Sequence, residues 1–373
     1  MRDSFEDLEL TILSSLAVKS KYSKGKVYSE SPCPFRTCFQ RDRDRVVHSK
    51  SFRRLKHKTQ VFIGTEDHYR SRLTHTLEVA QICRHISRLL RLNEDLAEVI
   101  AFAHDLGHTP YGHSGEKELD ALMSEQGGFE HNRQSRRIVD TLEEKYPDFP
   151  GLNLSFEVRE GLIKHSSPWD HPEPTPKVFI SLESQIVNVS DEIAYNAHDL
   201  EDGLHSKMFE EGDLEKNVPL WGELKTKIKN RYTHIDFDIL LNLIRSEFIS
   251  TQISDILLSS HQKINETAIT SLEGLQETET PLITFSPTMA EHNKILREYL
   301  FQNFYSHPSI YRMNKKGQHI IRGLFKAFSE DTQLLPIRFQ KKISSLSKER
   351  VVCDYIAGMT DTYALKEYQS IYA

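Results

Sequence analysis

The sequence predicts an all-α fold, in which a helical core is followed by an additional C-terminal helical region. The first observation is a run of apolar residues at helical spacing from Arg72 to Leu92. A second such run follows Asn93, and a third extends from Ser181 to Gly203. The pattern remains polar and helical from His205 onward, so we expect helices throughout the chain.

Composition narrows the class of protein. The chain has 373 residues and is 38% hydrophobic, which is enough for a sizeable core. Its formal charge is −6, which does not by itself call for a nucleic-acid partner. No run approaches the roughly 18 apolar residues of a membrane span, and the mixed-charge start differs from a signal peptide. We therefore expect a cytoplasmic protein without a membrane partner, whose four scattered cysteines are reduced.

We divide the chain into three segments of one globular unit. Residues 1–66 are expected to form a helical and basic N-terminal segment packed on the core, residues 67–204 the core, and residues 205–373 the C-terminal helical region. Within the first segment we expect a short helix, an irregular stretch to Pro34 and a helix over Cys38–Leu55. The next stretch, Lys56–Ser71, contains β-branched and aromatic residues and a glycine, which suggests a short strand or turn.

A basic run extends from Arg41 to Lys58 and holds eight Lys/Arg against two Asp. Such a run often forms a solvated helix face, but it is also a candidate polyanion site.

The helix over Arg72–Leu92 carries the first candidate site residues. Its buried stripe consists of Val79, Ile82, Cys83, Ile86, Leu89 and Leu90. His75 lies in the first turn and Arg72 three residues earlier, so the two side chains share a face.

The second helix begins at Asn93, a good N-cap, and ends with His104 and Asp105. Gly107 and Pro110 terminate it, so we expect residues 106–114, with His108 and His113, to form a loop or a strongly bent turn.

Later helices supply further candidates. We expect a helix from about His131, and on the 181–203 helix Asp191, Tyr195 and Asp199 are spaced i, i+4 and i+8 along one edge. In the C-terminal third we expect interruptions near residues 211–213, 277–287 and 314–317, and a final helix that runs through Gly358.

These residues form a plausible metal and proton-transfer site. One histidine, a His-Asp pair and a later aspartate give two imidazoles and two carboxylates, a donor set that suits Mn, Fe, Ni, Zn or Mg and leaves positions for water and a phosphate oxygen. His113 lies three residues before Glu116, a carboxylate that can orient its ring as in a general acid/base dyad. The spacing of His104 and His108 also matches zinc proteases, but Gly107 and Pro110 argue against the continuous helix those sites need.

Several motifs together resemble the bacterial deoxyguanosine triphosphate triphosphohydrolase-like branch of the HD-domain superfamily. They are FQRDRDRVVHSKSFRRLKHKTQVF, HYRSRLTHTLEVAQ, AFAHDLGHTPYGHSGE, GFEHNRQS, SLESQIVNVSDEIAYNAHD and DYIAGMTDTYA. The resemblance implies an HD metal-dependent phosphohydrolase core. One departure is Thr362, where the family motif is expected to carry Arg, so effector dependence or nucleotide preference can differ here.

The resemblance also implies roles for individual residues. The metal ligands are expected to be His75, His104, Asp105 and Asp191. His113, supported by Glu116, is expected to transfer the proton, and Arg72 to clamp the α-phosphate. The remaining expected substrate contacts are His108 and His131 to the phosphates, Tyr195 and Asp199 to the sugar, and Gln60 near the 3′-hydroxyl.

The implied reaction is attack of water at the α-phosphorus of dGTP or another deoxynucleoside triphosphate, which releases the deoxynucleoside and intact triphosphate. It requires a divalent metal, one of Mn, Mg, Fe, Ni, Co or Zn. The resemblance further implies a homo-oligomer, a tetramer or hexamer, with an allosteric nucleotide effector at subunit contacts.

Two alternatives stay open. One is another HD-type nucleotidase or phosphodiesterase, and the other is a nucleotide sensor or single-strand nucleic-acid binder that uses the basic run for weak contacts. The nature of the products separates the enzymes, and the absence of turnover would favour the sensor.

Overall fold

A computed structural model of the chain describes residues 1–61, 70–163, 181–232, 234–267, 269–275, 278 and 280–372. Within these residues the structure is all-α, as predicted, and its β-structure is restricted to the isolated bridges Lys26–Ser155, Thr59–Ser71 and Glu144–Gly151. The α-helices are α1 (Arg2–Ile12), α2 (Cys38–Val47), α3 (Lys50–Arg54), α4 (Arg72–Leu89), α5 (Glu94–Ala103), α6 (Gly112–Leu122), α7 (His131–Arg137), α8 (Phe156–Ile163), α9 (Leu182–His205), α10 (Glu211–Asn217), α11 (Pro219–Arg231), α12 (Phe237–Thr267), α13 (Leu272–Leu275), α14 (Pro287–Leu300), α15 (Pro308–Glu330), α16 (Ile337–Gln340), α17 (Lys348–Ala357) and α18 (Asp361–Tyr372).

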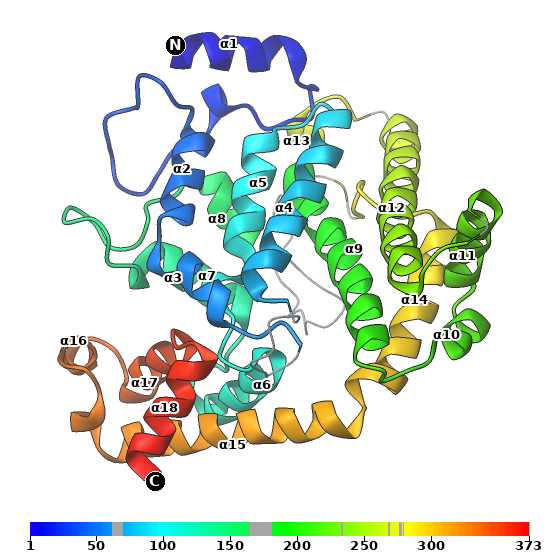
Figure 1. Cartoon of the computed structure of the whole chain (residues 1–373). Helices are drawn as coiled ribbons and strands as arrows, with labels where there is room; N and C mark the ends of the chain where they lie inside the picture. Colours follow the sequence, from blue (N-terminus) through cyan, green and yellow to red (C-terminus); the bar gives the residue numbers. More distant parts are fainter. Residues whose placement is uncertain are drawn as a thin grey trace.

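Helices α4, α5 and α9 lie together at the centre of the molecule (Figure 1). Their apolar stripes form a core whose buried side chains include Val79, Ile82, Ile86, Leu96, Ile100 and Ile186. The three helices begin at side-chain caps, because Ser71, Asn93 and Ser181 each accept a hydrogen bond from a backbone N–H of the first turn. The apolar periodicity therefore identified the three central helices, and the predicted cap at Asn93 is confirmed.

Two further cores flank the central one. The C-terminal half of α9 packs with α10, α11, α12 and α14 on the right of Figure 1, around buried residues such as Leu200, Trp221, Ile244 and Leu296. Below, the long helix α15 packs against α6, α17 and α18, with Leu119, Ile321, Phe328 and Val352 at zero exposure. The N-terminal segment contributes to the central core through the buried side chains of Leu16 and Phe39.

Several predicted boundaries were wrong. The helix expected over residues 38–55 is broken between α2 and α3, since Ser49 caps a new helix. The interruption expected near residues 211–213 lies within α10, and the one expected at 314–317 lies within α15. The last predicted helix is divided into α17 and α18, with Gly358 at the end of α17.

Two other predicted features lie only partly within the described residues. The strand or turn expected after the basic run yields the Thr59–Ser71 bridge, but its central residues 62–69 lie outside the described residues. The interruption expected at residues 277–287 ends where α14 begins at Pro287, and residues 277 and 279 lie outside the described residues.

No helix within the described residues is both long enough and apolar enough to cross a membrane.

A close contact between the segment after α5 and helix α7 determines the architecture around the candidate site. Residues His104–Gly107 form a short 3₁₀ turn, and a Cβ atom added to Gly107 would lie 2.1 Å from the carbonyl oxygen of His131. The Gly107 backbone N–H donates to the hydroxyl of Ser135, which in turn donates to the His104 carbonyl. Only glycine permits this approach, which places the end of α5 directly against the start of α7.

Candidate metal centre and active site

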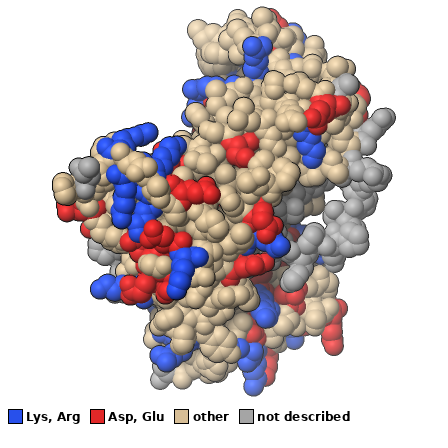
Figure 2. Space-filling view, turned by 90° about the vertical axis from the view of Figure 1, so that its right-hand side faces the viewer, with Lys and Arg blue, Asp and Glu red and all other residues tan. Residues whose placement is uncertain are grey.

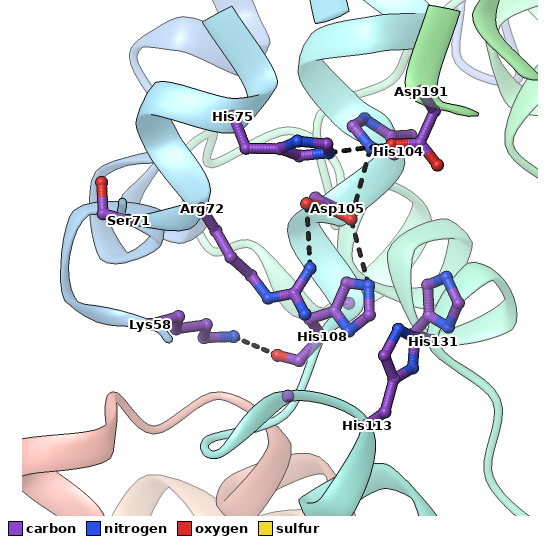
Figure 3. Close-up of polar contacts among 12 residues, drawn as sticks. Lys58, Ser71, Arg72, His75, His104, Asp105, His108, His113, His131 and Asp191 are labelled. Atoms are coloured by element: carbon purple, nitrogen blue, oxygen red, sulfur yellow. Dashed lines mark hydrogen bonds and ion pairs between the residues drawn. The ribbon is translucent and has the colours of Figure 1, made fainter. Parts of the chain in front are cut away.

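Three of the four expected metal ligands converge in the middle of the central helices (Figure 3). His75 comes from the first turn of α4, His104 from the turn after α5, and Asp191 from α9. Their possible ligand atoms all lie within 4.8 Å of one another. The Oδ1 atom of Asp191 lies 2.8 Å from His75 Nε2 and 3.7 Å from His104 Nε2.

Asp105, the fourth expected ligand, links this group to the neighbouring residues. Its Oδ1 atom lies 3.3 Å from His104 Nε2 and 3.1 Å from His108 Nε2, and its Oδ2 atom accepts a hydrogen bond from Arg72 over 3.1 Å. Burial favours the neutral acid, but His104, Arg72 and His108 hold the pKa of Asp105 well below its usual value. The carboxyl is therefore ionised, as a metal ligand must be.

These residues fit a divalent metal ion. Two imidazole nitrogens and two carboxylates are ligands that first-row transition metals and Mg²⁺ accept, and their atoms are close enough to surround one ion. All four residues are at most 8% exposed, so the donors already point into a protected site. This mixed donor set suits several ions and does not select one of them.

A second group of histidines lies next to the metal centre and is organised by Glu116. One oxygen of this carboxylate lies 3.1 Å from His113 Nδ1, and the other accepts from both the ring Nδ1 and the backbone N–H of His131, each over 2.8 Å. Burial opposes ionisation, but the charge of His131 and the hydrogen bonds from both rings hold the pKa of Glu116 well below its usual value. Glu116 is thus an anion that orients two imidazoles.

His108 completes this group. Its ring stacks on that of His131, with centroids 4.0 Å apart and an angle of 18° between the planes, and its edge-to-face neighbour is His113 at 5.2 Å. Burial lowers the pKa of His108 well below its usual value, and the nearby charges of Arg72 and His131 act in the same direction. His108 is therefore a neutral ring, buried at 3% exposure, whereas the side chain of His113 is 57% exposed.

The structure corrects the expected position of His113. It lies in the first turn of α6 and not in a loop, because the chain turns sharply at Tyr111 and Gly112, which both have positive φ angles. The backbone N–H of Tyr111 donates to Asp361, and its hydroxyl donates to the Asp361 carbonyl, so the start of α18 holds this turn in place. A rigid helix therefore presents His113 beside His108 and His131.

Several buried polar atoms around Arg72 have no hydrogen-bond partner among the described residues. They are Arg72 Nε, His108 Nδ1 and the side-chain oxygen of Gln60. Arg72 itself is 2% exposed. A Cβ atom added to Gly112 would lie 3.3 Å from a terminal nitrogen of Arg72 and would also contact the backbone of Gln60, so Gly112 lies close to both residues. Because unpaired buried polar groups are costly, these atoms are well suited to contact a polar ligand.

Tyr195 and Asp199 follow Asp191 along α9 at one and two helical turns, as the spacing predicted. Asp199 accepts a hydrogen bond from the hydroxyl of Tyr305, and burial raises its pKa to about 8 in spite of that bond. The hydroxyl of Tyr195 is buried and has no hydrogen-bond partner among the described residues.

Sequence reasoning missed three residues beside the site. Lys58, the last residue of the basic run, is buried and donates to the carbonyls of His108 and Ala357, which fixes the segment that carries His108. Glu78 and His198 lie behind His75 and contact each other. Their spacing from His75 and Asp191, three and seven residues, is a helical signal that could have identified them.

Most arginines near the start of the basic run have structural partners. Arg43 pairs with Asp95 and Glu98, and the buried Arg45 pairs with Glu30 and donates to backbone carbonyls. On the face of the molecule in Figure 2, basic and acidic groups lie beside one another and uncharged residues cover most of the surface. Neither these paired arginines nor this one face forms a broad basic surface of the kind that binds nucleic acid. Thr362, the departure from the family motif, is exposed in the first turn of α18.

Comparison with known proteins agrees with this site. Residues 72–196 match the family model of the HD domain, and residues 283–370 match that of the phosphohydrolase-associated domain. The first match includes ten of the candidate residues, from Arg72 to Tyr195. HD domains bind divalent metals, in agreement with the donor set described above.

Full-length relatives point in the same direction. The chain is 47% identical over 370 residues to a deoxyguanosinetriphosphate triphosphohydrolase-like protein of Geobacter metallireducens, which covers 98% of this chain and 96% of the relative. Proteins of the same name from Geobacter sulfurreducens and Ralstonia pickettii are 45% and 44% identical, and cover 99% and 97% of this chain and 97% and 95% of their own lengths. The chain therefore belongs to the deoxyguanosinetriphosphate triphosphohydrolase-like family of HD-domain phosphohydrolases.

Proposed function

We propose that this protein is a metal-dependent deoxynucleoside triphosphate triphosphohydrolase. In the proposed reaction, a water oxygen bonds to the α-phosphorus and the bond between that phosphorus and O5′ breaks. The leaving O5′ takes up a proton, and the products are the deoxynucleoside and intact triphosphate. The proposal rests on one observation above all: a group of metal-binding type and a histidine–carboxylate pair lie side by side in the core of the HD domain.

We assign the metal to His75, His104, Asp105 and Asp191. The bound divalent ion would neutralise charge that develops on the phosphoryl oxygens. Support for this ligand set comes from the short separations of its donor atoms and from the depressed pKa of Asp105. Arg72 pairs with Asp105, one of the proposed ligands. Its guanidinium is therefore near enough to the proposed metal to donate to an α-phosphate oxygen as well.

We assign proton transfer to His113 and its orientation to Glu116. The 3.1 Å contact from Glu116 to His113 Nδ1 leaves Nε2 of the exposed ring for the substrate. The anionic carboxylate stabilises an imidazolium, so the ring can accept a proton from water or hold one for O5′. His108 and His131, stacked beside it, are the proposed contacts to the remaining phosphate oxygens.

The sugar is assigned to the α9 edge and to Gln60. Tyr195 and Asp199 extend from the metal ligand Asp191 along one helix face, which supports a deoxyribose position next to the metal. A tyrosine under the sugar would exclude a 2′-hydroxyl sterically and so favour deoxynucleotides. The unpaired side-chain oxygen of Gln60 is the proposed acceptor for the 3′-hydroxyl.

We also propose regulation by a nucleotide effector in a homo-oligomer, with the second half of the basic run as its contact. A cavity of about 390 Å³ lies there, and Lys50, Arg54, Arg338, Lys342 and Tyr355 are among its lining residues. Charge reversal at Arg53 and Arg54 should weaken activation by a second nucleotide, and unchanged activation kinetics would reject this part of the proposal. Arg53→Glu alone serves as the milder variant, because Arg54 donates to the Gly358 carbonyl whereas Arg53 is exposed.

The main proposal is tested by a turnover screen. The purified protein is incubated with each of four deoxynucleoside triphosphates, singly and in pairs, with Mg²⁺, Mn²⁺ or Co²⁺, and the phosphate products are separated by anion exchange. Tripolyphosphate and deoxynucleoside in equal amounts support the proposal. Orthophosphate or pyrophosphate would point to a nucleotidase or phosphodiesterase, and the absence of turnover in every combination would favour a nucleotide sensor.

A further inference from the structure

A second buried histidine lies directly behind the candidate ligand His75. His198, on α9, is 1% exposed, and its Nδ1 atom lies 3.4 Å from His75 Nδ1. The two rings are edge to face, with centroids 5.4 Å apart and an angle of 78° between the planes. A hydrogen bond between these two Nδ1 atoms requires a hydrogen on one of them and a lone pair on the other. The partner of His198 Nε2 determines which of the two rings is the donor.

That partner is Glu78, one turn beyond His75 on α4. Its Oε2 atom contacts His198 Nε2, and its Oε1 atom accepts a hydrogen bond from Arg245 over 2.7 Å. A carboxylate paired with arginine can only accept at its other oxygen. His198 Nε2 therefore carries the hydrogen in this contact.

The remaining protonation states follow in order. A neutral His198 ring with hydrogen on Nε2 has a lone pair on Nδ1. His75 can then donate its Nδ1–H to this lone pair. The Nε2 atom of His75 faces Asp191, to which it donates when no ion is bound, and it is the atom available to bind a metal ion.

His104 reaches the same state by a simpler route. Its Nδ1 lies 2.6 Å from the carbonyl oxygen of Ala101, which can only accept, so Nδ1 carries hydrogen and Nε2, which faces the centre, is the atom available to bind an ion. No described contact joins the His75 ring to a backbone carbonyl, and the pair of His198 and Glu78 supplies the acceptor instead. Both imidazole ligands are thus oriented by a partner on the opposite ring nitrogen.

We propose that Glu78 and His198 form a relay that accepts the Nδ1–H of His75, directs its Nε2 toward the metal centre and thereby sets the metal affinity of the site. His198 and Glu78 are positioning residues, since neither belongs to the proposed ligand set or touches the substrate contacts. The inference rests on the proposed metal centre, and it extends that centre to α4 and α9 residues on the side away from the substrate. Partners of this kind typically change metal affinity by about 10- to 100-fold when they are removed.

Two substitutions at one position separate a relay from simple packing. In His198→Gln the amide oxygen can accept from His75 and the amide nitrogen can donate to Glu78, whereas His198→Leu fills similar space and can do neither. We expect Mn²⁺ affinity, measured by chelator competition, to fall about 10- to 100-fold in His198→Leu and to stay within about threefold of the parent in His198→Gln. Equal affinities in all three proteins, or equal losses in both variants, would overturn the relay.

The hydrogen bond itself provides a readout that does not depend on turnover or on metal. In ¹H–¹⁵N spectra of the metal-free protein the Nδ1–H of His75 should appear as a hydrogen-bonded, slowly exchanging proton, and His198→Leu should lose this signal. A His75 Nδ1–H signal that is unchanged in His198→Leu would contradict the inference. If the parent protein binds no metal at all, the proposed metal centre fails, but the ¹⁵N measurement still decides whether the relay exists.

Discussion

The Oε2 atom of Glu116 lies 3.1 Å from His113 Nδ1, because one turn of α6 places the two side chains on the same face of the helix. This contact gives the only well-exposed ring among the described site histidines a fixed orientation and an anionic partner. The other oxygen of Glu116 holds His131, so one carboxylate connects proton transfer with the proposed phosphate contacts.

Removal of the His113 ring should therefore separate catalysis from binding. In His113→Ala we expect kcat to fall by at least about 100-fold, because a positioned acid or base typically contributes about 10²- to 10⁴-fold. Mn²⁺ and nucleotide affinities should remain near those of the parent, as measured by calorimetry with the inactive variant. His85→Ala, which changes an exposed histidine on α4, is the matched control and should leave kcat unchanged. Retained turnover in His113→Ala would reject the assignment.

Asp191 has the opposite role. In Asp191→Ala the carboxylate that lies next to both ligand histidines is lost, and we expect the metal content of the purified protein to fall to background in elemental analysis. Turnover should disappear with the metal, and nucleotide binding should weaken. An unchanged metal content would show that Asp191 is not a ligand.

The contribution of Arg72 to kcat/KM should depend on the planar, forked shape of its guanidinium and not only on its charge. Arg72→Lys keeps the positive charge beside Asp105 but removes the planar set of donors. A hydrogen bond to a charged group is worth about 1.5–3 kcal/mol, so we expect kcat/KM to fall roughly 10- to 100-fold. Arg84→Lys, at an exposed position on the same helix, is the control. Equal kcat/KM values in the two variants would contradict the α-phosphate assignment.

Gly107 should be intolerant of a side chain. A Cβ there would lie 2.1 Å from the His131 carbonyl oxygen and 2.3 Å from the Ser135 backbone nitrogen, and neither backbone atom can move freely. We expect Gly107→Ala to lower the free energy of unfolding in urea by about 2 kcal/mol or more. In Gly212→Ala no atom lies within 4 Å of the new Cβ, and alanine should be neutral or stabilise α10 by up to about 1 kcal/mol. A Gly107→Ala protein as stable as Gly212→Ala would refute the close-contact argument.

Glu183 should make stability depend on pH. It accepts backbone hydrogen bonds from Val18 and Asn93, and burial raises its pKa to about 7 from an ordinary value of 4.5. Above pH 4.5 the unfolded chain releases this proton while the folded protein retains it, so the stabilisation is complete below pH 4.5 and is lost as pH rises to 7.

The neutral variant isolates this contribution. Glu183→Gln can still accept both backbone hydrogen bonds but does not titrate. Its free energy of unfolding, relative to that of the parent, should therefore rise by on the order of 3 kcal/mol between pH 4 and pH 8. Urea denaturation at several pH values measures the difference. A difference between the two proteins that is constant with pH would contradict the raised pKa.

The sequence was most informative where a side chain and its effect are local. The apolar periodicity predicted the three central helices, and Asn93 was recognised as the N-cap of α5. The spacing of Asp191, Tyr195 and Asp199 predicted their common edge on α9. The pairing of His113 with Glu116 was also predictable, because three residues separate them on what proved to be a helix.

Contacts between distant segments were not predictable in this way. The start of α6 depends on Asp361 of α18, which holds Tyr111 in a left-handed conformation. Helix α15 continues through its polar residues near Gly317, and that glycine allows close packing against the Tyr111 side chain. The contact of His198 with His75 and the burial of Lys58 likewise require the assembled fold, since each joins residues far apart in the chain.

The central claim, attack of water at the α-phosphorus, is tested most directly by the fate of solvent oxygen. The protein is allowed to hydrolyse a deoxynucleoside triphosphate in H₂¹⁸O, and both products are analysed by mass spectrometry. We predict one ¹⁸O atom in the tripolyphosphate and none in the deoxynucleoside, because the bond between phosphorus and O5′ breaks. Label in the deoxynucleoside hydroxyl, or labelled orthophosphate or pyrophosphate in place of tripolyphosphate, would contradict the account.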